Sequence, residues 1–233
     1  MLGRRTARRA GRRPDWPRAR RALKALLDNP QATVNAFELN DALDPDRYEQ
    51  GLQRLLQHPG GRRLYDRRPN LRQALADRET LALLPPGSFG RAYLDHLDRW
   101  GLAPAKLVEL MEARGIGDDA GLRWFAERHV LSHDIRHVLT GYGADMVGET
   151  TLLWFSYGID GGRSTALLMT GAGMRTLRVK DWRVVPLFWK ALRQGRRARD
   201  LLALPLEELL PRPLEEVRAL AGLRADRVNE GIA

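Results

Sequence analysis

The sequence predicts an all-α protein with a single helical domain over residues 25–233, built around a central pair of helices. Three observations favour this fold class. Apolar residues recur at helical spacing in most segments. Pro and Gly end those segments, and strand-like alternation is confined to 176–185. For that segment, "TLRVKDWRVV", we expect a short hairpin or an extended loop.

The individual helices follow from their start and stop signals. They are expected, in chain order, over 18–30, 45–61, 68–87, 88–102, 103–115, 118–140 and from 145 onward, with short helices over 205–223. Prolines end the first three, because proline cannot donate the backbone hydrogen bond that continues a helix. Ser88 is a suitable N-cap for the fourth. Gly141 and Gly143 end the long segment 118–140.

The net charge of +10 belongs mostly to one end of the chain. Residues 1–24 contain ten basic residues and one acidic residue, Asp15, so they account for nine of the ten net charges. We expect these residues to form a basic, disordered tail, with an anionic membrane or RNA contact as the alternative. The tail lacks the apolar stretch of a secretory signal. It also lacks the serines of a mitochondrial presequence, because the first serine is Ser88.

The segment His129–Glu149 holds three of the five histidines, at intervals of four residues. Residues four apart stack on one helix face, so His133 and His137 share a face and Asp134 lies in the same sector. After a Gly-rich turn, an antiparallel second helix would bring Glu149 beside them. Two imidazoles with one or two carboxylates suit zinc, iron(II) or manganese, so the sequence predicts a metal site.

Other interpretations explain less of this segment. A single buried histidine bonded to a backbone carbonyl would be ordinary core, but two at metal-ligand spacing next to a carboxylate are harder to explain. Zinc peptidases also use two histidines four apart with a Glu as general base, whereas the acid here is the shorter Asp134. Phosphohydrolases with a His-Asp pair need a further upstream His, for which His96 or His129 would have to serve.

The pattern His-Asp-x-x-His, eleven residues and then Glu resembles the signature of the ubiquinone (coenzyme Q) biosynthesis proteins of the Coq-four family. Three further blocks resemble that family: "LPPGSFGRAYLDHL", "GETTLLWFSYG" and "WKALRQGRRARDLLALPLEELLPRPLEEVRALAGL". The resemblance covers roughly residues 25–225. The Arg-rich tail and His129 are not part of it.

The resemblance implies that His133, Asp134, His137 and Glu149 hold a divalent metal, with zinc as the first choice and iron or manganese as alternatives. It also implies action on a polyprenylated hydroxybenzoate precursor, by decarboxylation coupled to hydroxylation at the carboxyl-bearing ring carbon. The expected protein is a metal-dependent, lyase-like decarboxylase/hydroxylase in which Asp134 is a ligand or the catalytic acid/base. The alternative is a non-catalytic isoprenoid-binding scaffold that organises a ubiquinone biosynthetic complex.

The resemblance further implies peripheral membrane association. The expected partners are the polyprenylated aromatic precursor, other ubiquinone-biosynthesis proteins and a membrane surface, with a homodimer left open and no specific nucleic acid. Because the substrate tail is a long isoprenoid, the site should open onto an apolar groove. Trp154, Phe155 and Tyr157 are candidates to bind the lipid there, with ordinary core as the alternative for the first two.

The segment 184–202, "VVPLFWKALRQGRRARDLL", predicts a helix that docks on anionic bilayers. Leu187, Phe188 and Leu192 would form its apolar side, and its Lys and Arg residues would add attraction to anionic lipid. We therefore expect a bacterial cytoplasmic protein that lies on the inner face of the cytoplasmic membrane.

Overall fold

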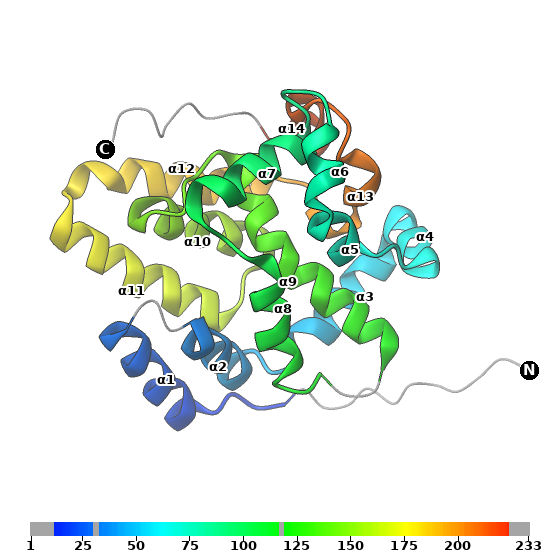
Figure 1. Ribbon diagram of the computed structural model, residues 1–233. Coiled ribbons are helices and arrows are strands. Elements are labelled where there is room, and N and C mark those ends of the chain that lie inside the picture. The colour runs from blue at the N-terminus through cyan, green and yellow to red at the C-terminus, as the bar shows by residue number, and fades with distance from the viewer. Residues whose placement is uncertain (1–11, 30–32, 117–118, 224–233) are drawn as a thin grey trace, which may run out of the picture. The chain divides into compact units, whose positions relative to one another are not determined.

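The computed structural model describes residues 12–29, 33–116 and 119–223 (Figure 1). Within these ranges the chain forms helices and no strand, and Ser88 and Pro213 make an isolated β-bridge. The all-α fold class is confirmed. The chain divides into two compact units, Met1–Arg47 and Tyr48–Ala233.

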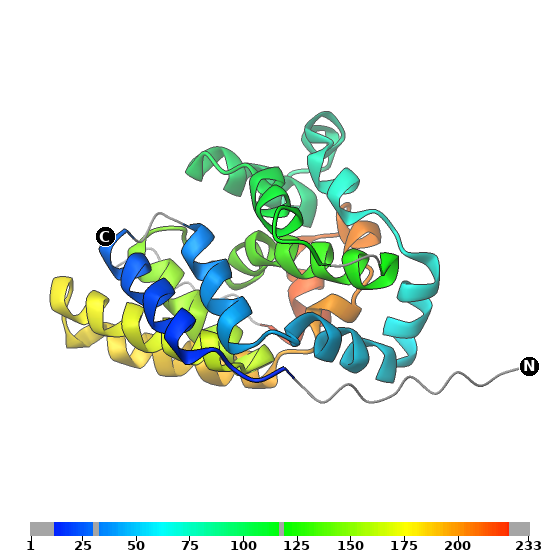
Figure 2. The same cartoon turned by 90° about the horizontal axis from the view of Figure 1, so that it is seen from below.

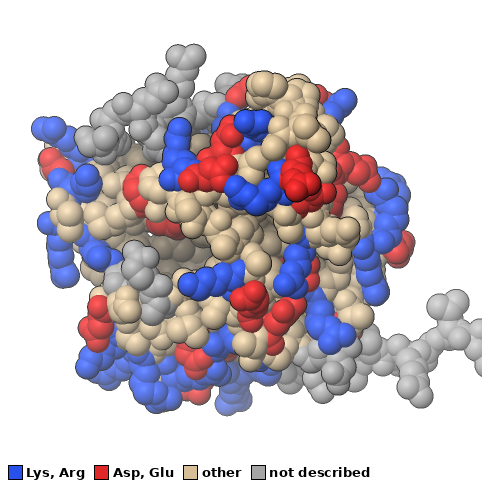
Figure 3. All heavy atoms as spheres, in the orientation of Figure 1, with Lys and Arg blue, Asp and Glu red and all other residues tan. Residues whose placement is uncertain are grey.

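The first unit is a helix pair, in which α1 (Trp16–Asp28) packs against α2 (Thr33–Leu43). Ala19 and Ala22 give α1 a buried apolar side, and Asp15 caps its start by accepting from the Arg18 N–H. Residues 16–24 are therefore helical, in line with the helix predicted over 18–30 and not with a disordered tail that reaches residue 24. Residues 1–11 of that tail lie outside the described residues. Figure 3 shows several Lys and Arg side chains gathered over α1.

The second unit contains the remaining helices. The first of them are α3 (Arg47–Gln57), α4 (Pro59–Arg67), α5 (Leu71–Ala76), α6 (Arg78–Leu83), α7 (Phe89–Trp100) and α8 (Pro104–Glu112). The next are α9 (Ala120–Thr140), α10 (Met146–Asp160), α11 (Arg163–Val179) and α12 (Val185–Arg197), with the 3-10 helix η1 (Trp182–Val184) before α12. Then follow η2 (Leu201–Ala203), α13 (Leu206–Leu209) and α14 (Leu214–Leu220). The predicted N-cap Ser88 does cap α7.

The long helix α9 is central to this unit, because α5, α7, α8 and α14 all contact it. Its start is capped by Asp119, which accepts hydrogen bonds from first-turn N–H groups. Near its end, Arg218 of α14 donates to the carbonyls of Val138 and Leu139. Gly141 then adopts the left-handed conformation, with φ 77°, that ends the helix. The helix that carries the histidine motif is thus fixed at both ends.

Helix α10 packs along α12 and α11 rather than along α9 (Figures 1 and 2). The contact with α12 is so close that a Cβ on Gly195 would lie 2.1 Å from the carbonyl oxygen of Phe155, and the absence of a side chain on Gly195 permits it. We expected α9 and α10 to form an antiparallel pair, and that pairing is not confirmed. The first turn of α10 meets α9, and the rest of α10 belongs to the α10–α12 group.

The segment 176–185 contains no strand, so the predicted hairpin is wrong. It comprises the end of α11, a two-residue break at 180–181, η1 and the first residue of α12. Thr176 is buried, and its hydroxyl lies 2.9 Å from the Thr150 hydroxyl of α10. This packing against α10 outweighs the preference of Thr and Val for strands, which depends strongly on context.

The apolar side of α12 is covered by protein. Leu187, Phe188 and Leu192, which we expected to face a bilayer, are each at most 5% exposed. They are buried because α12 turns this side inward as it packs against α10. Among the described residues, no helix combines the length and the apolar character needed to cross a membrane.

Candidate metal centre

Three of the predicted ligands lie together. His133 and His137 occupy successive turns of α9, and Glu149 lies in the first turn of α10. One donor atom from each lies within 4.8 Å of the others. One carboxylate oxygen of Glu149 is 3.3 Å from His137 Nε2, and the other is 3.7 Å from His133 Nε2. The carboxylate therefore faces both imidazoles.

His137 has one ring nitrogen fixed by the protein and the other directed to Glu149. Its Nδ1 lies 2.9 Å from the carbonyl oxygen of Tyr142. Because a carbonyl can only accept, Nδ1 carries the proton and Nε2 keeps its lone pair. Nε2 is buried and has no hydrogen-bond partner in the described part of the chain. A carbonyl behind the far nitrogen is the usual support of a metal-binding histidine, so this geometry fits a metal ion.

The turn between α9 and α10 determines where Glu149 points. Asp145 caps α10 by accepting from the N–H groups of Val147 and Gly148, at 2.8 and 2.9 Å. A Cβ on Gly148 would lie 1.9 Å from the carbonyl oxygen of Gly143, closer than a side chain allows. This glycine lets the turn fold back onto α10. Glu149, the next residue, is thereby directed towards α9.

Burial and charge act in opposite directions on these groups. Burial alone would raise the pKa of Glu149, but its contacts with His137 and His133 outweigh burial and lower that pKa. Burial alone would lower the pKa of His137, but the Glu149 carboxylate outweighs burial and raises it. Desolvation lowers the pKa of His133, although 45% of its side chain is exposed. A negative Glu149 at neutral pH favours a bound cation.

Asp134 is buried next to this group but is not among the three residues whose donor atoms converge. Burial raises the pKa of Asp134. Burial, followed by the charge of Asp134, also raises the pKa of Tyr93 on α7. The Tyr93 hydroxyl is buried without a hydrogen-bond partner among the described residues. A role for Asp134 as ligand or acid/base stays a prediction.

His96 on α7 also reaches this site, although the metal motif predicted from the sequence did not include it. Its ring stacks on His137, with centroids 5.2 Å apart and 23° between the planes. Burial, together with the charge of His137, lowers the pKa of His96 to about 4. Spacing along α9 and α10 cannot reveal this residue, because it comes from a different helix. Its one signal is that histidine is rare in this chain.

Two imidazoles and one carboxylate are a donor set found in catalytic zinc sites, where three protein ligands leave a fourth position for water or substrate. Iron(II) and manganese accept the same donors. His133, His137 and Glu149 would hold such an ion, with Nε2 as the donor atom of His137. The arrangement can bind and polarise an oxygen-containing substrate group.

Comparison with known proteins agrees with this motif. Residues 20–226 match the family model described as "Coenzyme Q (ubiquinone) biosynthesis protein Coq4". The chain belongs to this family. The Coq4 family comprises ubiquinone biosynthesis proteins, as the resemblance of the motif predicted.

Individual relatives support the assignment to the Coq4 family. "Ubiquinone biosynthesis protein coq-4, mitochondrial" of Neurospora crassa is 31% identical over 175 residues, which is 72% of this chain and 48% of the relative. "Ubiquinone biosynthesis protein COQ4, mitochondrial" of Yarrowia lipolytica is 30% identical over 178 residues, or 73% of this chain and 64% of the relative. The chain thus spans between about half and two thirds of the length of these relatives.

A crystal structure of a protein from Nostoc punctiforme has the same fold. It superposes with a TM-score of 0.64, covering 91% of this chain and 100% of the other. The two sequences are 18% identical, so this likeness shows the fold alone.

The names of the curated Coq4 relatives correct one expectation. Both relatives are named as mitochondrial, which contradicts a location in the bacterial cytoplasm on the inner membrane face. That expectation rested on the composition of the basic tail, mainly its lack of serine. Composition is a weak signal of location.

The predicted lipid-binding residues are differently placed on α10. Phe155 is fully buried and meets Tyr142 edge to face, so it is part of the core of this Coq4 chain. Trp154 is half-buried and stacks on Phe188 of α12, with ring centroids 5.6 Å apart. Tyr157 is half-buried. Trp154 and Tyr157 therefore keep some surface for a ligand, and Phe155 keeps none.

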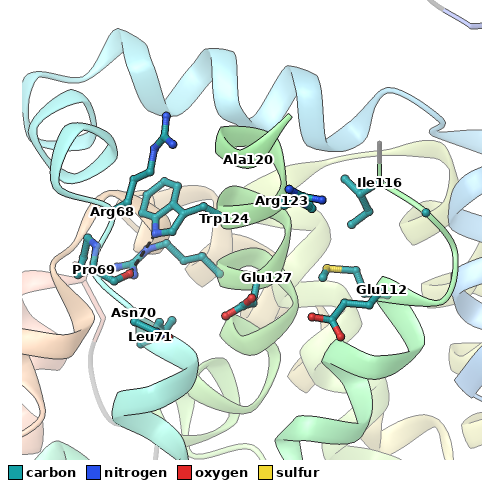
Figure 4. A pocket seen from close by; sticks show the side chains of 13 residues that line it. Arg68, Pro69, Asn70, Leu71, Glu112, Ile116, Ala120, Arg123, Trp124 and Glu127 are labelled. Carbon is teal, nitrogen blue, oxygen red and sulfur yellow. Dashed lines mark hydrogen bonds between the residues drawn. The ribbon is translucent and has the colours of Figure 1, made fainter. Parts of the chain in front are cut away.

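A cavity of about 760 Å³ lies at the other end of α9, near its start (Figure 4). Trp124 and Glu127 of α9 and Glu112 of α8 are among its lining residues. The lining carries both Arg and Glu side chains, and none of the three candidate metal ligands belongs to it. The cavity is therefore separate from the candidate metal centre.

Proposed function

We propose that this member of the Coq4 family is a metal-dependent enzyme of ubiquinone biosynthesis. Its substrate would be the polyprenylated hydroxybenzoate precursor, and the reaction would be decarboxylation coupled to hydroxylation at the carboxyl-bearing ring carbon. The carboxyl group would leave as CO₂, a hydroxyl group would take its place, and molecular oxygen would accept the two electrons. The observation that carries the proposal is the buried lone pair of His137 Nε2, which lacks a hydrogen-bond partner and lies 3.3 Å from the Glu149 carboxylate. Such an arrangement suits a metal ion better than it suits an apolar core.

The residues around the site would have different roles in the reaction. His133, His137 and Glu149 would hold the ion, which when bound supplies a positive centre that polarises a ring carboxylate or phenolate. Asp134 would hold or release a proton next to the reacting ring, and its burial favours the protonated form. The Tyr142 carbonyl would keep the His137 ring in the tautomer that binds metal.

A non-catalytic scaffold is the second candidate. It is favoured by the packing of α10, which lies against α12 and α11 rather than α9. An ion shared by His133, His137 and Glu149 would then act as a structural link between α9 and α10. In this case Asp134 would contribute to stability rather than to turnover.

We also propose that the protein docks on anionic membranes through exposed side chains of 182–193, rather than through the apolar side of 184–202 that the sequence suggested. Trp182 is 71% exposed and Trp189 is 51% exposed. Lys190 and Arg193 of α12 are exposed as well. Tryptophan is enriched at membrane interfaces, and basic residues add attraction to anionic lipid.

The Asp134→Asn variant separates the enzyme from the scaffold. Asn keeps the size and polarity of Asp but cannot take up a proton. If Asp134 is the acid/base, turnover of a soluble short-tailed precursor should fall by about 10²–10⁴-fold, with metal content and melting temperature retained. The exposed Asp66 of α4 provides a matched control, because Asp66→Asn removes the same charge from a helix that carries no residue of the site.

The measurements are product formation by purified protein and ubiquinone levels in a strain that lacks its own family member. A folded, metal-loaded Asp134→Asn protein that turns over precursor at the wild-type rate would refute a catalytic Asp134. Wild-type protein that restores ubiquinone in the strain but forms no product in vitro would favour the scaffold.

A further inference from the structure

His96 is a half-buried histidine of the site that the proposed function does not use. It comes from α7, whereas the three candidate ligands come from α9 and α10. Its Nε2 is buried and has no hydrogen-bond partner in the described ranges. An unpaired buried nitrogen costs free energy, so native proteins usually pair such an atom with a side chain, a water or a bound group.

The surroundings of His96 indicate which kind of group would pair with it. Its ring lies face to face with the His137 ring, which bears the buried lone pair. The charges of His137, Glu149 and His133 all act on His96, as does that of Arg99 from its own helix. His96 therefore belongs to the same cluster as the three candidate ligands.

Direct ligation is not what the distances favour. The donor atoms within 4.8 Å of one another come from His133, His137 and Glu149, and His96 is outside that group. A four-coordinate ion bound by these three has one open position, which water or an oxygen of a substrate fills. An oxygen in that position can form a hydrogen bond, and His96 Nε2 is a buried nitrogen that has no hydrogen-bond partner among the described residues.

We propose that His96 is a positioning residue, whose Nε2 hydrogen-bonds to the oxygen in the open coordination position. The chemical class of the bound group is an aromatic carboxylate or phenolate, with water in its place before binding. The inference rests on the proposed metal centre. His96 would thus act in two ways: its face supports the His137 ring, and its edge orients the incoming oxygen.

The test uses the full chain loaded with Co²⁺, whose visible absorption changes when an oxygen ligand enters. The probe is 4-hydroxybenzoate. His96→Phe keeps an aromatic ring for the stack but removes the nitrogen, and we expect it to keep its cobalt and to bind the probe roughly 10-fold more weakly. His96→Gln places an amide near the position of Nε2 and should recover part of the affinity. His58→Phe, at an exposed histidine, should bind as the wild type does.

Two results would overturn the proposal. One is a His96→Phe protein that binds 4-hydroxybenzoate as tightly as the wild type. The other is a folded His96→Phe protein that loses its cobalt, which would make His96 a ligand. Wild-type protein that takes up no cobalt would instead show that the proposed metal centre is wrong, and the inference would fail with it.

If His96→Phe does not fold, the ¹⁵N chemical shifts of His96 in the zinc-loaded wild type test the proposal. These shifts should change when 4-hydroxybenzoate is added, and unchanged shifts would contradict the proposal.

Discussion

Arg128 and His137 lie on the same helix, α9, and each is about 1% exposed, yet their polar atoms are paired very differently. The Arg128 guanidinium donates to the carbonyl of Leu202 at 3.1 Å and to Glu207 at 2.6 Å, and it also donates to the carbonyl of Leu204. The His137 ring has one hydrogen bond, at Nδ1, and its Nε2 has none in the described residues.

The difference separates a structural role from a binding role. Arg128 ties α9 to η2 and α13, and each of its three nitrogens donates to a protein acceptor. The Nε2 atoms of His137 and His96 are buried without a hydrogen bond among the described residues, the former facing the Glu149 carboxylate, and the two rings are stacked on each other. The same helix therefore serves as the anchor of the unit around Arg128 and as a candidate metal centre around His137.

The largest effect should come from breaking the anchor. Arg128→Met leaves the Leu202 and Leu204 carbonyls and the Glu207 carboxylate buried without their donor. The free energy of unfolding should fall by about 3–5 kcal/mol, because an uncompensated buried charge remains. Chemical denaturation with a chelator present measures this loss without any contribution from metal.

The control for this variant is Arg67→Met, since Arg67 and Glu208 form an ion pair in which both side chains are more than half exposed. Its removal should cost less than about 1 kcal/mol. The folded Arg128→Met protein should still bind metal. Loss of metal binding from a folded Arg128→Met protein would break the proposed separation of roles.

Arg136 is an intermediate case on the same helix. Its Nη1 lies 2.7 Å from Asp160 of α10, while its Nε is buried without a partner in the described part of the chain. Burial alone would raise the pKa of Asp160, but the charge of Arg136 outweighs it and lowers that pKa below its ordinary value of 3.8. The pair thus contributes stability above pH 3.8, which is lost as the pH falls through the folded-state pKa.

Asp160→Asn should therefore be less stable than the wild type by about 2–3 kcal/mol at neutral pH. This loss of stability is smaller than the loss of about 3–5 kcal/mol typical of a fully buried ion pair, because 23% of the Asp160 side chain is exposed. The difference should shrink as the pH falls below 3.8, which denaturation at a series of pH values will show. A difference that stays constant down to the lowest pH at which both proteins fold would refute an ion-pair origin.

The smallest effect should come from the surface of η1 and α12, where the side chains of Trp182 and Trp189 are exposed to solvent. Charge reversal of Lys190 or Arg193 should weaken binding to anionic liposomes by at least about 1 kcal/mol per residue. Replacing Trp182 and Trp189 with Ala should weaken it further. Flotation with neutral and anionic vesicles measures the change, with Leu83→Ala as the control, because Leu83 is 86% exposed on α6.

Two outcomes would count against this membrane surface. Binding that does not depend on anionic lipid would contradict the role of Lys190 and Arg193. Binding that disappears when residues 1–11 are removed would assign the effect to the Arg-rich N-terminal segment instead.

The parts of the site that were predictable depend on short-range geometry. His133 and His137 had to share a face because they lie one helical turn apart. The ends of α9 were marked by Asp119 and Gly141, whose capping roles depend on local backbone and side-chain chemistry. A short turn then limited how far Glu149 could lie from the two histidines.

The features that the sequence did not reveal depend on long-range packing. Nothing in the spacing of α7 indicates that His96 stacks on His137. The apolar side of α12 could equally have faced a bilayer or another helix, and the close contact at Gly195 places it against α10. Asp134 shares a helix sector with the two histidines, yet its carboxylate is buried and lies outside the group of three converging donors.

The central claim is that His133, His137 and Glu149 bind a metal ion, and elemental analysis of purified protein tests it most directly. The wild type should contain about one divalent ion per chain, as expected for a single site with three protein ligands. His137→Ala should contain almost none, while His58→Ala, at an exposed histidine, should match the wild type. Equal metal content in the wild type and a folded His137→Ala protein would contradict the claim.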